Sequence, residues 1–172
     1  MPLMRAYFAA AIAAAAITAT SAQAQSSSPN KVQGTWRVVS AQIEEDGKTR
    51  PVYGEQPQGM LVFTPDMHFV EVLTDGSTPR FASSARGQGT DAENRAAMAS
   101  SIGFFGTYSV DEHGEFSGNR VLGSTFPNWV GSTRTSKELS LVVKGDRMSE
   151  RFQRPEGSRV TIEFERVRNP TN

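Results

Sequence analysis

The sequence predicts an all-β protein: a closed or nearly closed antiparallel up-and-down barrel of about eight strands, with one short helix at an open end. Two observations predict this fold. After residue 30, runs of β-branched and aromatic residues alternate with short turns rich in glycine, proline and aspartate, as in a series of hairpins. In addition, Trp36 near the beginning and Arg166 near the end are suited to contact each other. A contact between the first and last strands would close the sheet into a barrel.

The argument for closure rests on the last predicted strand, residues 159–167. Its apolar side chains share one face under the two-residue period of a strand: Val160, Ile162 and Phe164. Arg166 continues this inward face, where a guanidinium group needs a planar partner. The end of an antiparallel strand meets the beginning of its neighbour, and the indole of Trp36 offers the best cation–π surface there. The alternative is that Trp36 is an ordinary core residue and Arg166 a solvated charge.

The motif Gly34-Thr35-Trp36, closed over by Arg166, resembles the lipocalin barrel. Further segments are similar to small bacterial lipocalin-like domains: residues 53–66, 104–108, 126–131 and 164–166. The resemblance covers nearly the whole chain after residue 30 and implies a barrel that holds a small hydrophobic molecule. Two departures from the resemblance stand out. The larger lipocalins usually carry a helix after the barrel and often disulfides, whereas this chain ends soon after Arg166 and has no cysteine. In addition, Met67 stands where the family is expected to have glycine.

Residues 1–24 read as a secretory signal peptide, with a basic start, an alanine-rich apolar run to Ile17, and small residues at Ala22 and Ala24. We expect cleavage after Ala24 and a periplasmic or secreted protein. The apolar run is shorter than the roughly 20 residues that a membrane-spanning helix needs, so no integral membrane segment is expected after cleavage. The rest of the chain divides into a flexible leader (25–30), a lipocalin-like barrel domain (31–168) and a tail (169–172).

The first strand is predicted from Gly34 to Glu44. If Trp36 faces inward, Ser40 and Gln42 share its face. Polar groups inside a barrel need partners or a wet cavity, so both are candidate ligand-binding residues. The alternative is a bulge that shifts the pleat and turns Ile43 inward instead.

The segment from Thr49 to Gln58 contains two prolines and a glycine, which predicts a loop across one mouth of the barrel. Tyr53 in this loop can contact a ligand or plug the opening. The next hairpin covers residues 59–74, and His68 begins its return strand. As one of only two histidines, His68 is a weak candidate for an acid or base; the alternative is a surface imidazole.

A helix is predicted from about Asp91 to Ile102. Thr90 and Glu93 form a capping-box pattern, the following residues are rich in alanine, and Gly103 ends the segment. Met98 lies four residues before Ile102, so the two share a face that can lie across or beside the open end of the barrel. The helix is either a movable lid or a fixed stopper.

The strand from Phe104 to Asp111 places Tyr108 on an inward face. Its ring and single hydroxyl suit a mostly apolar ligand, and it is also a weak catalytic candidate. The sequence 126–129 holds a proline beside aromatic residues, which predicts a loop or bulged corner. In it, Asn128 and Trp129 either contact a ligand or brace the barrel.

The last three strands are predicted over residues 131–143, 147–153 and 159–167. Arg134, Lys137 and Glu138 look like solvated positions on the outside.

The chemical inventory is short. No metal site or cofactor is expected, because the chain has no cysteine and its two histidines lack metal-ligand spacing. The 18 basic and 18 acidic residues argue against nucleic acid as a partner. The leading hypothesis is an exported protein that binds a small hydrophobic or aromatic molecule. The alternative is a cofactor-free isomerase, cyclase or lyase that uses Tyr108 or His68 for proton transfer.

Overall fold

The fold is described by a computed structural model, which covers residues 29–168 of the chain. The predicted signal peptide, most of the leader and the tail lie outside the described residues. The elements are β1 (Gly34–Glu45), β2 (Lys48–Pro51), β3 (Pro57–Phe63), β4 (His68–Asp75), α1 (Asp91–Ala99), β5 (Ser101–Val110), β6 (Phe116–Ser124), the 3₁₀ turn η1 (Pro127–Trp129), β7 (Thr133–Thr135), β8 (Leu139–Lys144), β9 (Arg147–Gln153) and β10 (Arg159–Arg166).

The strands form one antiparallel sheet in the order β7-β6-β5-β4-β3-β1-β10-β9-β8, and β2 pairs with β1 outside this path. The sheet curls until β7 and β8, the two ends of the path, approach each other without a hydrogen-bonded ladder between them in the described residues. The first strand β1 lies between β3 and the last strand β10. The protein is therefore a nearly closed barrel of nine strands with one short helix, as the sequence predicts.

The contact between the first and last strands lies at the base of the barrel. Trp36 stands opposite Arg166 in the β1–β10 register, and the guanidinium carbon lies 4.0 Å from the centroid of the indole. Arg166 also donates to the carbonyl oxygens of Gln33 (2.6 Å) and Lys31 (3.0 Å). Gly34 makes room for this arrangement, since a Cβ there would lie 2.7 Å from Nη1 of Arg166. The Gly-x-Trp motif therefore serves the closure of the barrel.

A bulge in β1 changes which side chains face the interior. The β1–β10 register shifts between Val38 and Ser40, and after the shift Ala41 and Ile43 are buried, each 1% exposed. Ser40 and Gln42 consequently lie on the opposite face and are only partly buried. The alternative of a bulge that turns Ile43 inward is therefore the correct one, and Ser40 and Gln42 do not line the cavity, because one extra residue in a strand reverses the alternation of its side chains.

The turn between β3 and β4 keeps a glycine-like backbone at Met67. This residue has a φ of 66°, in the left-handed region that glycine adopts most easily. Its side chain packs against the hydrophobic core. Met67 therefore adopts the backbone conformation that a glycine would favour at this position.

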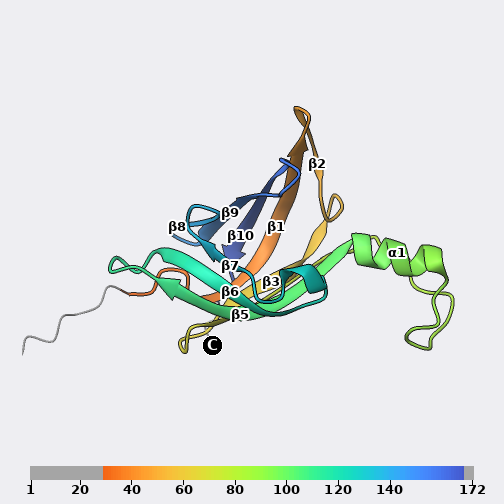
Figure 1. Ribbon diagram of the computed structural model, residues 1–172, viewed down its shortest axis with the longest axis horizontal. Coiled ribbons are helices and arrows are strands. Elements are labelled where there is room, and N and C mark those ends of the chain that lie inside the picture. The colour runs from red at the N-terminus through yellow and green to blue at the C-terminus, as the bar shows by residue number, and fades with distance from the viewer. Residues whose placement is uncertain (1–28, 169–172) are drawn as a thin grey trace, which may run out of the picture.

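Helix α1 begins as predicted and ends earlier. Thr90 accepts a hydrogen bond from the backbone of Glu93, whose side chain in turn accepts from the backbone of Thr90. The helix stops at Ala99, because Ile102 is already paired with Leu73 in the β4–β5 ladder. Figure 1 shows α1 and the loop before it projecting beside one end of the barrel, and none of its residues is buried.

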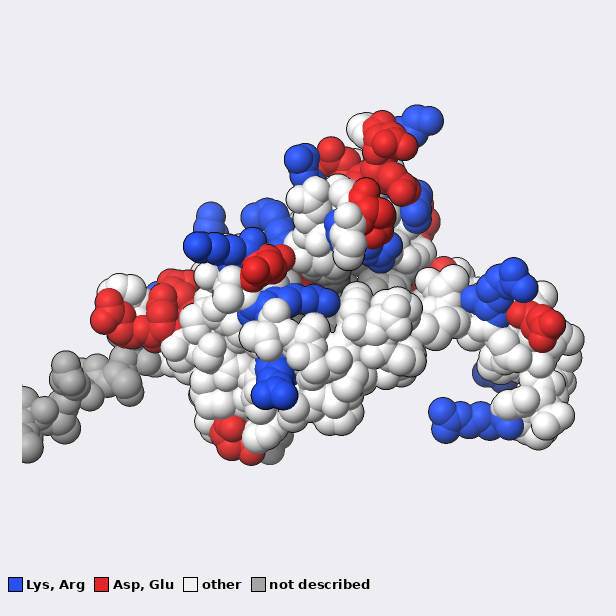
Figure 2. Space-filling view, in the orientation of Figure 1, with Lys and Arg blue, Asp and Glu red and all other residues white. Residues whose placement is uncertain are grey.

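The outer surface is uneven in charge. Large apolar side chains on the outside of β3 to β6 are exposed: Met60, Val70, Val72, Phe105 and Leu122. Figure 2 shows few charged residues over the middle of β5 and β6, whereas acidic and basic side chains gather near β1, β2, β9 and β10. Among the described residues, no helix has the length and apolar character needed to cross a membrane.

Candidate functional site

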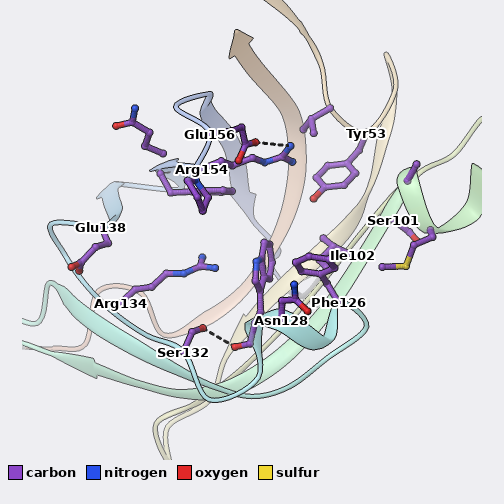
Figure 3. Close-up of a pocket in the computed structure, with 17 residues that line it drawn as sticks. Tyr53, Ser101, Ile102, Phe126, Asn128, Ser132, Arg134, Glu138, Arg154 and Glu156 are labelled. Carbon is purple, nitrogen blue, oxygen red and sulfur yellow. Dashed lines mark hydrogen bonds and ion pairs between the residues drawn. The ribbon is translucent and has the colours of Figure 1, made fainter. Parts of the chain in front are cut away.

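A cavity of about 680 Å³ opens at the end of the barrel next to α1. Its walls come from the loop after β2, the start of β5, the η1 turn, β7 and the turn after β9 (Figure 3). Most of the lining is apolar or aromatic, with contributions from Tyr53, Ile102, Phe126, Trp129 and Phe152. A volume of this size is typical of small-molecule sites, which range over roughly 300–1,000 Å³.

Three of the sequence-predicted ligand-binding residues meet at this cavity: Tyr53, Asn128 and Trp129. Tyr53 is 8% exposed, and its hydroxyl points into the cavity (Figure 3). The two tyrosines that the sequence offered as ligand contacts are widely separated, because Tyr108 follows the cavity residue Ile102 by six positions along β5, about 20 Å in a strand.

Tyr108 and His68 lie at the opposite end of the barrel, beside the β3–β4 turn. The hydroxyl of Tyr108 donates to the carbonyl oxygen of Thr64 (2.8 Å) and accepts from Nδ2 of Asn30 (2.7 Å). Desolvation raises the pKa of Tyr108. His68 is exposed, with its Nδ1 within 3.0 Å of the carbonyl oxygen of Asp66. In this position Tyr108 ties together the closed end of the barrel, and neither residue contacts the cavity.

An aromatic wall holds an arginine at the cavity. Trp129 packs edge-on against Phe104 (5.2 Å between centroids) and Phe126 (5.9 Å). The guanidinium carbon of Arg134 lies 4.8 Å from the centroid of Trp129 and 5.7 Å from that of Phe152, which is cation–π distance for both rings. Arg134 thus lies between the rings of Trp129 and Phe152, and Figure 3 shows its side chain extending into the cavity.

The prediction that Arg134 is a solvated outer residue is therefore wrong. In the β6–β7 register Arg134 stands opposite Asn119, whose side chain is buried. Residues opposite each other in a ladder share a face, so Arg134 points inward with Asn119. Strand β7 has only three residues, all polar, and gives no alternation of apolar and polar residues from which this direction could be read.

Two buried carboxyl groups lie in the interior near Arg134, and sequence analysis missed both. Glu71 on β4 and Glu150 on β9 are each 3% exposed. Each interrupts an inward apolar face at the two-residue spacing, between Phe69 and Leu73 and between Met148 and Phe152. An acidic residue in the middle of an otherwise apolar strand face is the signal that would have identified them.

Burial gives both carboxyl groups a preference for the protonated form. Desolvation, and next the negative charge of Glu150, raises the pKa of Glu71 well above its usual range, while Arg134 lowers it. Desolvation raises the pKa of Glu150 to about 7, and Arg134 again opposes the shift. Because two like charges in a dry interior are costly, the pair holds at least one proton near neutral pH.

We expect this pair to make the protein less stable at alkaline than at mildly acidic pH. A carboxyl group whose pKa is raised on folding stabilises the fold below its unfolded pKa, and that contribution is lost as the pH rises through the folded value. The urea midpoint should therefore fall between about pH 5 and pH 8. Glu150→Gln, which is neutral throughout, should flatten this dependence. An unchanged wild-type midpoint across this range would contradict the expectation.

Comparison with known proteins gives a family and a general likeness in structure. The family model for a lipocalin-like domain matches residues 33–156. A de novo designed fluorescence-activating β-barrel is similar in structure at 16% identity, covering 80% of this chain and 94% of its own, with a TM-score of 0.39. A redesigned β-barrel gives 15% identity, coverage of 83% and 100%, and a TM-score of 0.41. Among curated proteins, no sequence matches the chain.

Proposed function

This chain belongs to the family of lipocalin-like domains, and from that premise we propose that it is an exported protein that binds one small hydrophobic or aromatic molecule in the cavity at the open end of its barrel. The observation that carries the proposal is the contrast between the two ends. Around Trp36 the interior is filled by its own side chains, whereas the end beside α1 encloses a cavity with an aromatic wall.

The lining suits a molecule with a flat apolar body. Trp129 and Phe152 offer aromatic faces, and Ile102 with Phe126 adds apolar contact. A few polar groups reach the same space, among them the hydroxyl of Tyr53, and such groups fix the orientation of a bound ligand.

We favour binding over the alternative of a cofactor-free isomerase, cyclase or lyase. The two residues that the sequence offered for proton transfer, Tyr108 and His68, lie away from the cavity. A candidate acid or base must lie within hydrogen-bonding reach of its substrate, directly or through one water molecule.

A neutral fluorescent probe, N-phenyl-1-naphthylamine, tests the proposal. It should bind the folded protein with a rise in probe emission and a fall in tryptophan emission. Trp129→Ala should weaken binding by about tenfold or more, because it removes the largest aromatic surface of the wall. Phe105→Ala is the matched control, since Phe105 is an aromatic residue 51% exposed on the outside of β5. Equal binding by the wild type and Trp129→Ala would contradict the proposed site.

Export has its own test. We propose that residues 1–24 are removed, because the small residues Ala22 and Ala24 match the rule for signal-peptide cleavage. The protein recovered from the periplasm or the medium of the producing cells should begin at Gln25 when its N-terminus is sequenced. Soluble protein that retains Met1 would rule out this route.

A further inference from the structure

Three ionisable side chains lie at or just below the cavity: Glu71, Glu150 and Arg134. No ion pair within 4.0 Å among residues 29–168 involves Glu71, Glu150 or Arg134. The Oε2 atom of Glu150 is buried and accepts no hydrogen bond from any described residue. Buried polar atoms are almost always hydrogen-bonded in native proteins. An acceptor of this kind therefore indicates a missing donor.

The two carboxyl groups lie one step deeper than the floor of the cavity. Glu150 is two residues before Phe152 on the inward face of β9, and Phe152 lines the cavity. Glu71 stands opposite Phe104 in the β4–β5 register, and Phe104 packs against the cavity residue Trp129. A ligand that enters the cavity along Trp129 and Phe152, beside the guanidinium of Arg134, therefore points its leading end toward both carboxyl groups.

We propose that the ligand carries a basic nitrogen, as a primary or secondary ammonium group, which enters first and donates hydrogen bonds to Glu71 and Glu150. Its aromatic or apolar body then lies against Trp129 and Phe152. This inference rests on the proposed function and names the chemical class of the ligand. The ammonium group supplies the donor that Glu150 lacks among the described residues.

Charge balance supports a cation over a neutral or an anionic group. Without ligand, one carboxylate, one carboxylic acid and the guanidinium of Arg134 sum to zero. When an ammonium group binds, the shared proton leaves for solvent, and two carboxylates, Arg134 and the ammonium group again sum to zero. A neutral ligand leaves the proton in place, and an anion places a second negative charge beside a carboxylate in a dry interior, which is costly.

Of the titratable groups around the pair, only the two carboxyl groups are expected to lose a proton when the ligand binds. The positive charge of Arg134 on β7 lowers the pKa of both carboxyl groups, and the two carboxyl groups in turn raise the pKa of Tyr53 in the loop after β2. Burial raises the pKa of Tyr53 still further from neutrality, so it stays protonated. The strands beside β9 present apolar side chains opposite Glu150, namely Leu141 and Ile162. At the rim, the charged residues that line the cavity are Glu138, Arg154 and Glu156.

Three probes with the same naphthalene body test the inference: 2-naphthylmethylamine, 2-naphthalenemethanol and 2-naphthoate. At about pH 8 the ammonium probe should bind about tenfold or more tightly than the alcohol, and the carboxylate probe should bind most weakly. The affinity for the ammonium probe should rise with pH from about pH 5, by up to tenfold per pH unit, because its binding releases a proton. The affinity for the alcohol probe should not change with pH. Calorimetry in buffers of different protonation enthalpy should report release of about one proton per bound ammonium probe.

Glu150→Gln should remove the preference for the ammonium probe and its pH dependence while binding of the alcohol remains. Glu71→Gln serves as the second variant if the first does not fold, as checked by circular dichroism. Glu112→Gln, at an exposed glutamate in the turn between β5 and β6, is the matched control and should keep the preference.

The inference is overturned if the carboxylate probe binds most tightly or if both glutamine variants keep the ammonium preference. If N-phenyl-1-naphthylamine binds but the ammonium probe is no better than the alcohol, the inference fails and the proposed function stands. If none of the probes binds, both fail.

Discussion

Replacing Trp36 by alanine is expected to lower the free energy of unfolding by about 3–5 kcal/mol. The side chain is fully buried at the base of the barrel, and its Nε1 donates to the carbonyl oxygen of Val32 at 2.7 Å. The change leaves a cavity and removes the ring that covers the guanidinium of Arg166. Urea denaturation measures the loss. Trp129→Ala, the other tryptophan, is only partly buried at the cavity and should cost clearly less.

A double-mutant cycle shows whether the loss involves Arg166. The two side chains are in contact, so the combined loss in Trp36→Ala/Arg166→Ala should fall short of the sum of the single losses by about 0.5 kcal/mol or more. Strictly additive losses would mean that the cation–π contact contributes nothing to closure.

Gly106→Ala is expected to destabilise the barrel by on the order of 3 kcal/mol, a large effect for one added methyl group. A Cβ at Gly106 would lie 1.9 Å from the carbonyl oxygen of Arg120 and 3.0 Å from the ring of Phe69. The first of these atoms is backbone in the neighbouring strand β6, so the ladder itself would have to shift. The position adjoins a bulge in the β5–β6 register, where the two strands approach closely.

Gly103→Ala is the matched control for Gly106→Ala. Gly103 lies on the same strand, and a Cβ there would make ordinary contacts of 3.5 Å with Thr125 and 3.8 Å with Val72. Its effect should stay within about 1 kcal/mol of zero. Thermal or urea unfolding of both variants measures the difference. Similar losses for the two changes would show that the close approach at Gly106 does not limit packing.

The sequence predicts the barrel because its closing strands are marked by short periodic patterns. The two-residue period, the antiparallel direction and the match of indole to guanidinium together assign Trp36 and Arg166 to facing strand ends, and the structure places them opposite each other. The beginning of α1 is equally local, since Thr90 and Glu93 form the cap by themselves. Its end is set by tertiary pairing, because Ile102 joins the β4–β5 ladder. The alanine-rich pattern does not reveal that strand pairing competes with the helix for residues 100–102.

The candidate site was only partly predictable from the sequence, because some of its residues are placed by tertiary pairing. Tyr53, Asn128 and Trp129 could be found because they lie in loops that proline and glycine mark clearly. The direction of Arg134 depends on its pairing with β6, which no pattern within β7 reveals. Glu71 and Glu150 are 79 positions apart and come together only when the sheet curls. Their meeting is a property of the closed barrel.

The pairing of β1 with β10 also governs when this protein can acquire its fold during synthesis. The hydrogen bond from Arg166 to Gln33 joins residues 133 positions apart, so the ribosome has made almost the whole barrel before its closing strand exists. Until then β1 lacks one of its two neighbours, and the core around Trp36 stays open. Because its longest-range contacts form last, we expect this chain to fold more slowly than a protein of similar size whose contacts are local.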